Sequence, residues 1–204
     1  MKKEQYIITW SDESYTYPSL IIPIIDKIEE FRISKNLNKE EITIWCPFDV
    51  KEDMEYINQG WETIYLKQSL YYKCLKEAWY KLIISHIATW QDFFKVEPKI
   101  HYDLIISNPP FKWKAEFFKR ALVFNKPFAL VCPASWLNDW WPYNLFSDKR
   151  LQLFISDKRS KFFNKKWTIW NQPTFKAIYY CYNFLQQNDI QWFKLDKSLD
   201  INLL

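Results

Sequence analysis

The sequence predicts a single-domain α/β protein with three layers and a mostly parallel sheet. Helix-like and strand-like periodicities alternate along the chain, which favours an α/β arrangement. The strand-like segments are continuous apolar runs, which are typical of strands buried on both faces of a parallel sheet. The chain has 204 residues, of which 49% are hydrophobic, so one domain with a substantial core is expected.

The expected elements follow from this periodicity and from the residues at their ends. Pro18 favours a helix start, because proline is common in the first helical turn. Gly60 is expected to end a helix. The last two strands are expected to form an antiparallel hairpin at the sheet edge, with residues 186–189 as its turn. The predicted helices are 18–32, 51–58, 69–80 and 112–124, and the predicted strands are 42–46, 61–66, 81–87, 102–107, 127–132, 151–156, 177–184 and 191–195.

The composition argues against several classes of protein. Gly60 is the only glycine, whereas about 14 would be usual at the common frequency of about 7%. Glycine-rich phosphate loops are therefore absent, which removes the main support for nucleoside triphosphate or dinucleotide binding. Backbone positions with positive φ are expected to use Asn or Asp instead. The net charge of +4 weakly indicates a polyanionic partner, and an ordinary mixed-charge surface explains it equally well.

The cysteines and the hydropathy indicate a reduced compartment. Cys46, Cys74, Cys132 and Cys181 form no CxxC pair, so we expect buried reduced thiols, with no disulfide framework and no metal site. No apolar run approaches the roughly 18 residues of a membrane span. The N-terminal residues lack the apolar stretch of a signal peptide. A cytoplasmic protein is expected.

One segment carries most of the chemical information. A buried strand is predicted to end at Ser107 and to lead into Asn108, Pro109, Pro110 and Phe111. The two prolines would stiffen this loop. The Asn108 side-chain carbonyl and the Pro109 backbone carbonyl could accept hydrogen bonds from an exocyclic amine, while Phe111 could stack on an extruded base. The amine would then lie in line with a methyl donor.

Residues 107–111 (SNPPF) after an apolar strand resemble the catalytic motif of adenine-N6 DNA methyltransferases. Further segments resemble that family, and its small phage-type members in particular, from about residue 15 to 185. The resemblance implies a Rossmann-like methyltransferase fold over residues 1–204, with S-adenosylmethionine at the carboxyl ends of the strands. The further segments are 15–18 (YTYP), 43–49 (TIWCPFD), 91–94 (QDFF), 127–136 and 173–184.

The resemblance also assigns residues to the site. Asp92 would accept a hydrogen bond from the adenine amine of the cofactor, and Phe93 would pack on its ring. Asn108 would act on the target amine. The implied catalytic residues are Asn108, Pro109, Pro110 and Phe111, and the implied cofactor-binding residues are Tyr17, Pro47, Phe48, Asp49, His86, Asp92, Phe93 and Asn108.

Three of these assignments have ordinary structural alternatives. His86 lies near the family's ribose-binding acid only if 81–87, rather than 61–66, is the second strand of the sheet. Asp92 is also typical of a helix cap or a turn. Tyr17 is also typical of a core residue. The residue pattern leaves each of these alternatives open.

The chain departs from the family in its cofactor loop, where residues 46–49 (CPFD) replace a glycine-rich segment. A catalytically inactive, methyltransferase-like binding or inhibitor protein of phage origin is therefore an alternative function. RNA adenine and a protein glutamine are alternative substrates. We expect DNA as the partner, no membrane association, and a monomer or weak dimer. A short or relaxed recognition sequence is expected, read by residues 133–150.

Overall fold

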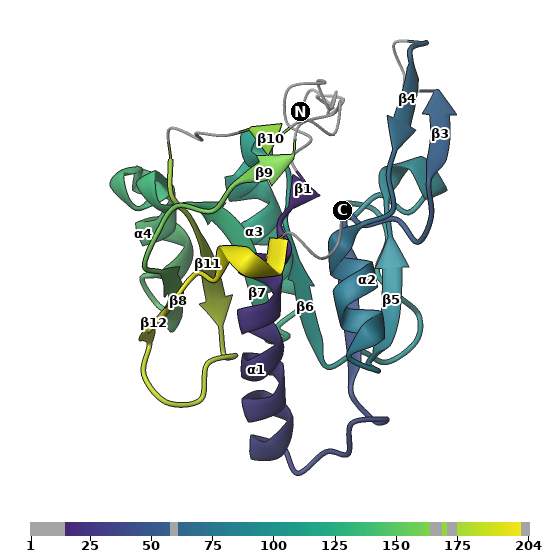
Figure 1. The fold of residues 1–204 in the computed structure, drawn as a ribbon. Helices are drawn as coiled ribbons and strands as arrows, with labels where there is room; N and C mark the ends of the chain where they lie inside the picture. The colour runs from purple at the N-terminus through teal and green to yellow at the C-terminus, as the bar shows by residue number, and fades with distance from the viewer. Residues whose placement is uncertain (1–14, 58–60, 164–168, 171–174, 201–204) are drawn as a thin grey trace.

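The computed structural model describes residues 15–57, 61–163, 169–170 and 175–200 (Figure 1). A seven-stranded sheet lies at the centre of this described chain, in the order β12-β8-β11-β7-β6-β2-β5. Its strands are β2 (Thr43–Pro47), β5 (Lys81–Ser85), β6 (Leu104–Ser107), β7 (Phe128–Pro133), β8 (Leu151–Ser156), β11 (Ala177–Tyr182) and β12 (Ile190–Phe193).

Most of the pairing in this sheet is parallel, as predicted. The neighbouring strands β5, β2, β6 and β7 all run parallel. β11 runs antiparallel to β7 and to β8, and β12 pairs with β8 in parallel. One reversed strand from the C-terminal part of the chain therefore lies inside an otherwise parallel sheet.

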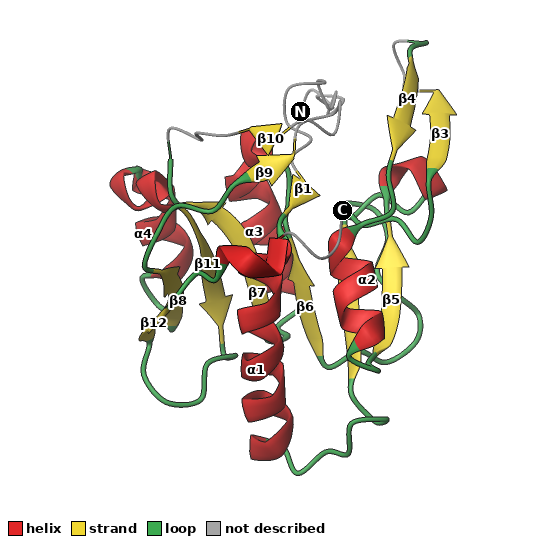
Figure 2. Cartoon of the chain, in the orientation of Figure 1, coloured by secondary structure: helices red, strands yellow, loops and turns green. Residues whose placement is uncertain are grey.

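Helices lie on both sides of the sheet, as Figure 2 shows. α1 and α2 pack against each other. α3 and α4 also pack against each other. The helices are α1 (Pro18–Ser34), α2 (Leu70–Glu77), α3 (Lys114–Val123) and α4 (Trp140–Phe146).

Both faces of the parallel strands are buried, because successive side chains of a strand point to opposite faces. Ile44 and Ile106 belong to the apolar cluster that includes the buried residues of α1 and α2. Their neighbours Trp45 and Ile105 belong to the cluster that includes those of α3. All four side chains are at most 1% exposed. The continuous apolar runs in the sequence therefore correspond to three packed layers.

Two smaller sheets and several short helices complete the described chain. The β3–β4 hairpin stands away from the central sheet (Figure 1). The other small sheet has the order β1-β9-β10. These elements are β1 (Tyr15–Thr16), β3 (Met54–Ile57), β4 (Thr63–Leu66), β9 (Phe162–Phe163), β10 (Ile169–Trp170), η2 (Ile87–Thr89), η3 (Phe111–Trp113), η4 (Ala134–Asn138) and η5 (Lys197–Asp200).

The predicted helix at 51–58 is wrong, because residues 54–57 form β3 and pair with β4. The side chains of β3 alternate between half-buried and exposed, which is the period of a strand and not of a helix. The strand predicted at 61–66 exists as β4, but it pairs in this hairpin and not in the central sheet. Gly60, expected to end the helix, lies outside the described residues.

The predicted C-terminal hairpin is also wrong in its pairing, because β8 lies between β11 and β12. β11 is buried along almost its whole length, so it needs a partner on each edge. The fully buried Gln152 of β8 fixes the chain where it leaves β11. Its Nε2 donates to the Leu185 carbonyl at 2.8 Å, and its Oε1 accepts from the backbone N–H groups of Phe184 and Leu185 at 2.9 Å each.

Positive φ angles are found at seven described residues, none of them glycine. Three are asparagines, as expected of a glycine-poor chain. The other four are aromatic, so the expectation of Asn or Asp is wrong for them. The asparagines are Asn36, Asn125 and Asn183, and the aromatic residues are Phe48, Trp61, Trp79 and Trp90.

We expect Gln152→Leu to lower the free energy of unfolding by about 3 kcal/mol or more, measured by urea denaturation. The substitution leaves two buried N–H groups and one carbonyl without partners, and each such group costs about 1–3 kcal/mol. The control is Gln191→Leu, because that amide makes one exposed hydrogen bond, to the Asn188 carbonyl. A change within about 0.5 kcal/mol is expected there. Equal losses in both variants would contradict the assigned role of Gln152.

Candidate functional site

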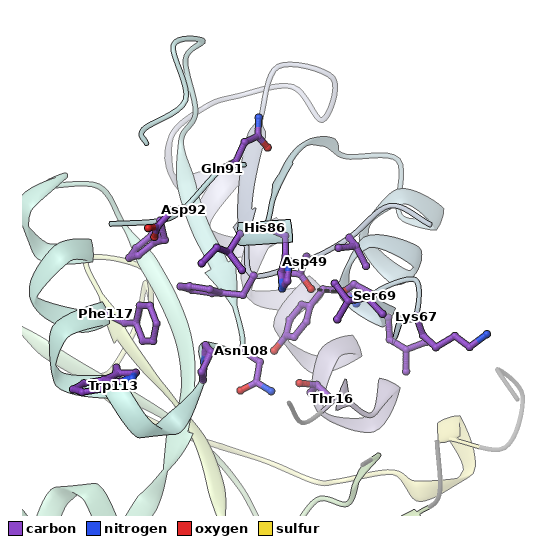
Figure 3. A pocket seen from close by; sticks show the side chains of 18 of the residues that line it. Thr16, Asp49, Lys67, Ser69, His86, Gln91, Asp92, Asn108, Trp113 and Phe117 are labelled. Atoms are coloured by element: carbon purple, nitrogen blue, oxygen red, sulfur yellow. Dashed lines mark hydrogen bonds between the residues drawn. The ribbon is translucent and has the colours of Figure 1, made fainter. Parts of the chain in front are cut away.

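A pocket opens where the chain leaves the carboxyl ends of β2, β5 and β6 (Figure 3). Parallel strands bring these ends to one edge of the sheet, so loops distant in sequence meet there. The empty space among the lining side chains is about 1070 Å³, including the part open to solvent. The lining residues are Thr16, Phe48, Asp49, Val50, Leu66, Lys67, Ser69, Leu70, Tyr71, His86, Ile87, Gln91, Asp92, Phe93, Phe94, Asn108, Pro110, Trp113 and Phe117.

Asp49 is a buried acid in the loop after β2, with only 6% of its surface exposed. Its Oδ2 lies within hydrogen-bond distance of the Ser107 hydroxyl oxygen, at 2.7 Å, and its Oδ1 accepts a hydrogen bond from the Ser69 hydroxyl. Ser107 ends β6, and its hydroxyl also contacts the Pro47 carbonyl. Ser69 caps α2 by accepting from the Tyr71 N–H at 3.2 Å. One carboxyl group thus connects a strand end, a helix start and the loop that carries it.

The protonation of Asp49 is shifted by this environment. Burial raises the pKa of the carboxyl to about 7, although the hydrogen bonds with Ser107 and Ser69 act in the opposite direction. Burial away from water destabilises an ionised carboxylate by more than hydrogen bonds with two neutral hydroxyl groups stabilise it. The group therefore titrates near neutral pH.

Phe48 lets the loop turn without glycine. Its φ is 71°, in the left-handed region that glycine adopts most easily. Its ring centroid lies 5.0 Å from that of Phe93 and 4.7 Å from that of Phe117. The next residue donates its backbone N–H to the Ser85 carbonyl at 3.3 Å. Aromatic packing and this hydrogen bond therefore hold the turn.

His86 follows β5, which is the direct neighbour of β2 in the central sheet. The neighbour of β2 in the central sheet is therefore 81–85 and not 61–66, which lies in the β3–β4 hairpin. Its Nδ1 accepts a hydrogen bond from the Ala88 N–H at 3.0 Å. Burial lowers the pKa of His86 to about 4, so the neutral ring carries its proton on Nε2 near pH 7. That N–H is a donor on the pocket wall.

Asp92 and Phe93 combine pocket and structural roles. The Asp92 Oδ1 accepts from the Phe94 N–H at 3.0 Å, which is a turn, and its Oδ2 lies 3.2 Å from the Lys95 Nζ. Phe93 is 4% exposed, with its ring centroid 5.3 Å from that of Trp45. Both residues line the pocket, while Asp92 also holds its own turn and Phe93 belongs to the core.

The loop of residues 108–111 begins directly after β6. Asn108 and Pro110 line the pocket, and in Figure 3 Asn108 lies between Trp113 and Thr16, away from Gln91 and Asp92. Pro109 and Phe111 are not among the lining residues. The half-buried Phe111 ring has its centroid 5.5 Å from that of Phe175 and 6.3 Å from that of Phe162, in T-shaped contacts.

Two residues assigned to the cofactor lie behind the pocket wall. Tyr17 is 2% exposed, belongs to the apolar cluster of α1, and precedes that helix. Burial, and then the nearby Asp200, raise its pKa to about 12. Pro47 is the buried last residue of β2, and its carbonyl faces Ser107 rather than the pocket. These two side chains support the site from the core.

Sequence reasoning missed several pocket residues. Ser69 has a local signal as a helix cap, but its contact with Asp49 spans 20 positions and leaves no trace in the sequence. Phe117 faces the pocket from α3, where helical periodicity predicts only that it is buried. The other missed residues include Lys67, Tyr71, Gln91 and Phe94, all on loops or at helix starts.

Comparison with known proteins does not place the chain in a family. No protein-family model matches it, and no curated protein is similar to it at a significant level. Over the described residues, no cluster of three or more His, Cys, Asp or Glu side chains could hold a metal ion. Within the same residues, no helix has both the length and the apolarity to cross a membrane.

Proposed function

We propose that this chain transfers a methyl group from S-adenosylmethionine to the N6 amine of adenine in DNA. The position of Asn108 carries this proposal. It directly follows a buried parallel strand, two prolines hold the loop after it, and it lines a pocket at the carboxyl edge of the sheet. The parallel sheet with one reversed C-terminal strand is compatible with the Rossmann-like methyltransferase fold that the sequence resemblance implies.

The chemistry of the pocket fits S-adenosylmethionine, which combines a flat adenine ring with polar ribose and amino-acid parts. Phe48 and Phe94 offer aromatic surface to a ring. The Nε2–H of His86 suits a ribose hydroxyl, and the Asp92 carboxylate suits an adenine amine. When bound, the cofactor supplies an electrophilic methyl group on a sulfonium sulfur. A mixed apolar and polar lining of this kind is typical of small-molecule sites.

The residues of the catalytic loop would act on the target base. The Asn108 side-chain carbonyl and the Pro109 backbone carbonyl accept the two N–H bonds of the exocyclic amine. The nitrogen lone pair is thereby directed toward the methyl donor, and the gain comes from orientation. The T-shaped contacts of Phe111 fix its ring for stacking on an extruded base.

The proposed DNA surface extends from the pocket to residues 133–150. η4 begins directly after the carboxyl end of β7, and β7 is the neighbour of β6 in the sheet. Exposed aromatic residues follow, including Trp140 and Tyr143, which are 66% and 73% exposed, and then the basic Arg150. Aromatic faces can stack on bases, and basic groups can contact phosphate.

We expect S-adenosylmethionine to bind the purified protein and to raise its melting temperature. His86→Ala should weaken the affinity about five- to tenfold, because one hydrogen bond contributes about 1 kcal/mol. His101→Ala is the matched control, since that ring is exposed and pairs with Asp103 outside the pocket. Isothermal titration calorimetry measures both. If millimolar cofactor gives neither heat nor a melting shift with the unaltered protein, an inactive binding protein becomes the better proposal.

We expect Asn108→Ala to abolish methyl transfer while cofactor affinity stays within about twofold, because Asn108 is assigned to the target amine. The measurement is N6-methyladenine in the DNA of cells that express each variant. Asn38→Ala, an exposed loop residue, is the control. Wild-type methylation by Asn108→Ala would remove Asn108 from its assigned role. Cofactor binding without any DNA methylation by the unaltered protein would favour RNA or a protein glutamine as substrate.

A further inference from the structure

The Ser107 hydroxyl has one hydrogen but lies against two acceptors. Its Oγ contacts the Pro47 carbonyl oxygen and lies 2.7 Å from the Asp49 Oδ2. The Pro47 carbonyl can only accept. The Ser69 hydroxyl accepts from the Tyr71 N–H, so its own hydrogen is available for the Asp49 Oδ1. The Ser107 Oγ, the Pro47 carbonyl oxygen and the Asp49 Oδ2 therefore share one serine hydrogen unless Asp49 supplies another.

Protonated Asp49 satisfies every one of these contacts. A hydrogen on Oδ2 is donated to the Ser107 Oγ, and the Ser107 hydrogen is then donated to the Pro47 carbonyl. An ionised Asp49 would leave one close oxygen pair without a hydrogen, in a place where Ser107 is fully buried and Asp49 nearly so. Buried acceptors without a donor are costly.

Among the residues that the structure describes, the titratable groups around Asp49 place no cation beside it. Cys46, Tyr71 and Tyr179 have pKa values raised chiefly by burial, so all three are neutral near pH 7. His86 is neutral as well, because burial lowers its pKa. Of the charged pocket residues, Lys67 pairs with Asp53 on the surface, and Asp92 pairs with Lys95.

We propose that Asp49 is a positioning residue that works in its protonated form, locking the loop after β2 to the end of β6 next to Asn108. Ionisation breaks one contact of this lock and loosens the pocket. Cofactor affinity therefore falls as pH rises through neutrality. The effect on affinity rests on the proposed methyltransferase function, whereas the protonation itself does not.

Asp49→Asn is the decisive variant, because its amide reproduces the protonated form. The amide N–H donates to Ser107, and the amide oxygen accepts from Ser69. In the unaltered protein the folded-state pKa lies above the unfolded one. Its stabilisation is therefore complete at acid pH and is lost as pH rises through about 7. We expect the melting temperature to fall more between pH 5 and pH 8 in the unaltered protein than in Asp49→Asn.

Infrared difference spectra provide a test that needs no ligand. We expect a protonated-carboxyl band at pH 6 that disappears near pH 8 and is missing in Asp49→Asn. Asp53→Asn, a change of an exposed acid, should keep the band. Absence of the band in the unaltered protein, or identical pH dependence of melting in Asp49→Asn, would overturn the proposal.

The second test measures the affinity of the protein for S-adenosylmethionine at pH 6 and at pH 8. If only the protonated form binds, affinity falls about tenfold between these pH values. Asp49→Asn should show no such fall. Equal affinity of the unaltered protein at both pH values would overturn the coupling to the pocket. If the cofactor fails to bind at either pH, the proposed function fails, and the infrared band alone decides the state of Asp49.

A second inference concerns three exposed tryptophans with left-handed backbone. Trp61, Trp79 and Trp90 have φ values of 62°, 66° and 62° and are 88%, 83% and 93% exposed. Trp79 follows α2 in a Schellman motif: its N–H donates to the Lys76 carbonyl at 2.9 Å, and the Tyr80 N–H donates to the Leu75 carbonyl at 3.2 Å. Glycine is the usual residue at this position.

The composition also indicates that tryptophan occupies positions where glycine is usual, because the chain has 12 tryptophans and one glycine. A left-handed conformation costs a residue with a Cβ roughly 1 kcal/mol or more, and side chains this exposed have little packing to offset it. We infer that positions 61, 79 and 90 are glycine positions, encoded by UGA, a codon that some genetic codes assign to tryptophan and others to glycine. The chain made under the glycine assignment would carry the residue its backbone requires.

Trp79→Gly and Trp90→Gly should each raise the melting temperature by about 2–4 °C. Trp192→Gly is the control, because Trp192 is also exposed but lies in the strand β12, where glycine is unfavourable. A lower melting temperature is expected there. Peptide mass spectrometry of the protein from its own organism should read glycine at the three positions. Tryptophan at these positions, or no gain in stability, would overturn the inference.

Discussion

The buried carboxyl of Asp49 is the contact on which the site depends. Ser107 is the last residue of β6 and Asn108 is the next one, so the contacts that hold Ser107 also set where the loop of residues 108–111 begins. Asp49 holds it from the loop after β2 and reaches the start of α2 through Ser69. Without a glycine-rich loop, the chain uses a polar bridge and the packed ring of Phe48 to fix the same edge of the sheet.

Local patterns in the sequence located most of the fold. The strands 151–156 and 42–46 and the helix 18–32 lie within two residues of β8, β2 and α1, because their apolar periodicity and flanking residues are unambiguous. The errors concern pairing. Residues 54–57 form a strand because they pair with β4. Burial on both faces, together with the hydrogen bond from Gln152 to the Leu185 carbonyl, holds β11 beside β8. Partner choice is decided in three dimensions, and no local pattern encodes it.

For the candidate site, too, some residues are indicated by the sequence and others only by the fold. Asn108, Asp49 and His86 line the pocket and lie just after strand ends; the family resemblance, together with the predicted strands, singled them out in the sequence. Tyr17 and Pro47 are not among the lining residues, since adjacency in sequence does not say which face a side chain occupies. The link between Asp49 and Ser69 required the fold, because α2 is brought to the sheet only by packing.

The reversed strand β11 has a consequence for the order of assembly. β8 meets the rest of the sheet only through β11, which is made later in the chain. During synthesis, β2, β5, β6 and β7 can therefore pair as soon as they emerge, and the pocket edge forms from this earlier part of the chain. β8 remains an open edge until residues 177–182 arrive, because pairing of distant segments must wait for the later one. A ribosome-bound chain lacking its last 30 or so residues would thus expose an apolar strand edge beside a pocket that is already shaped.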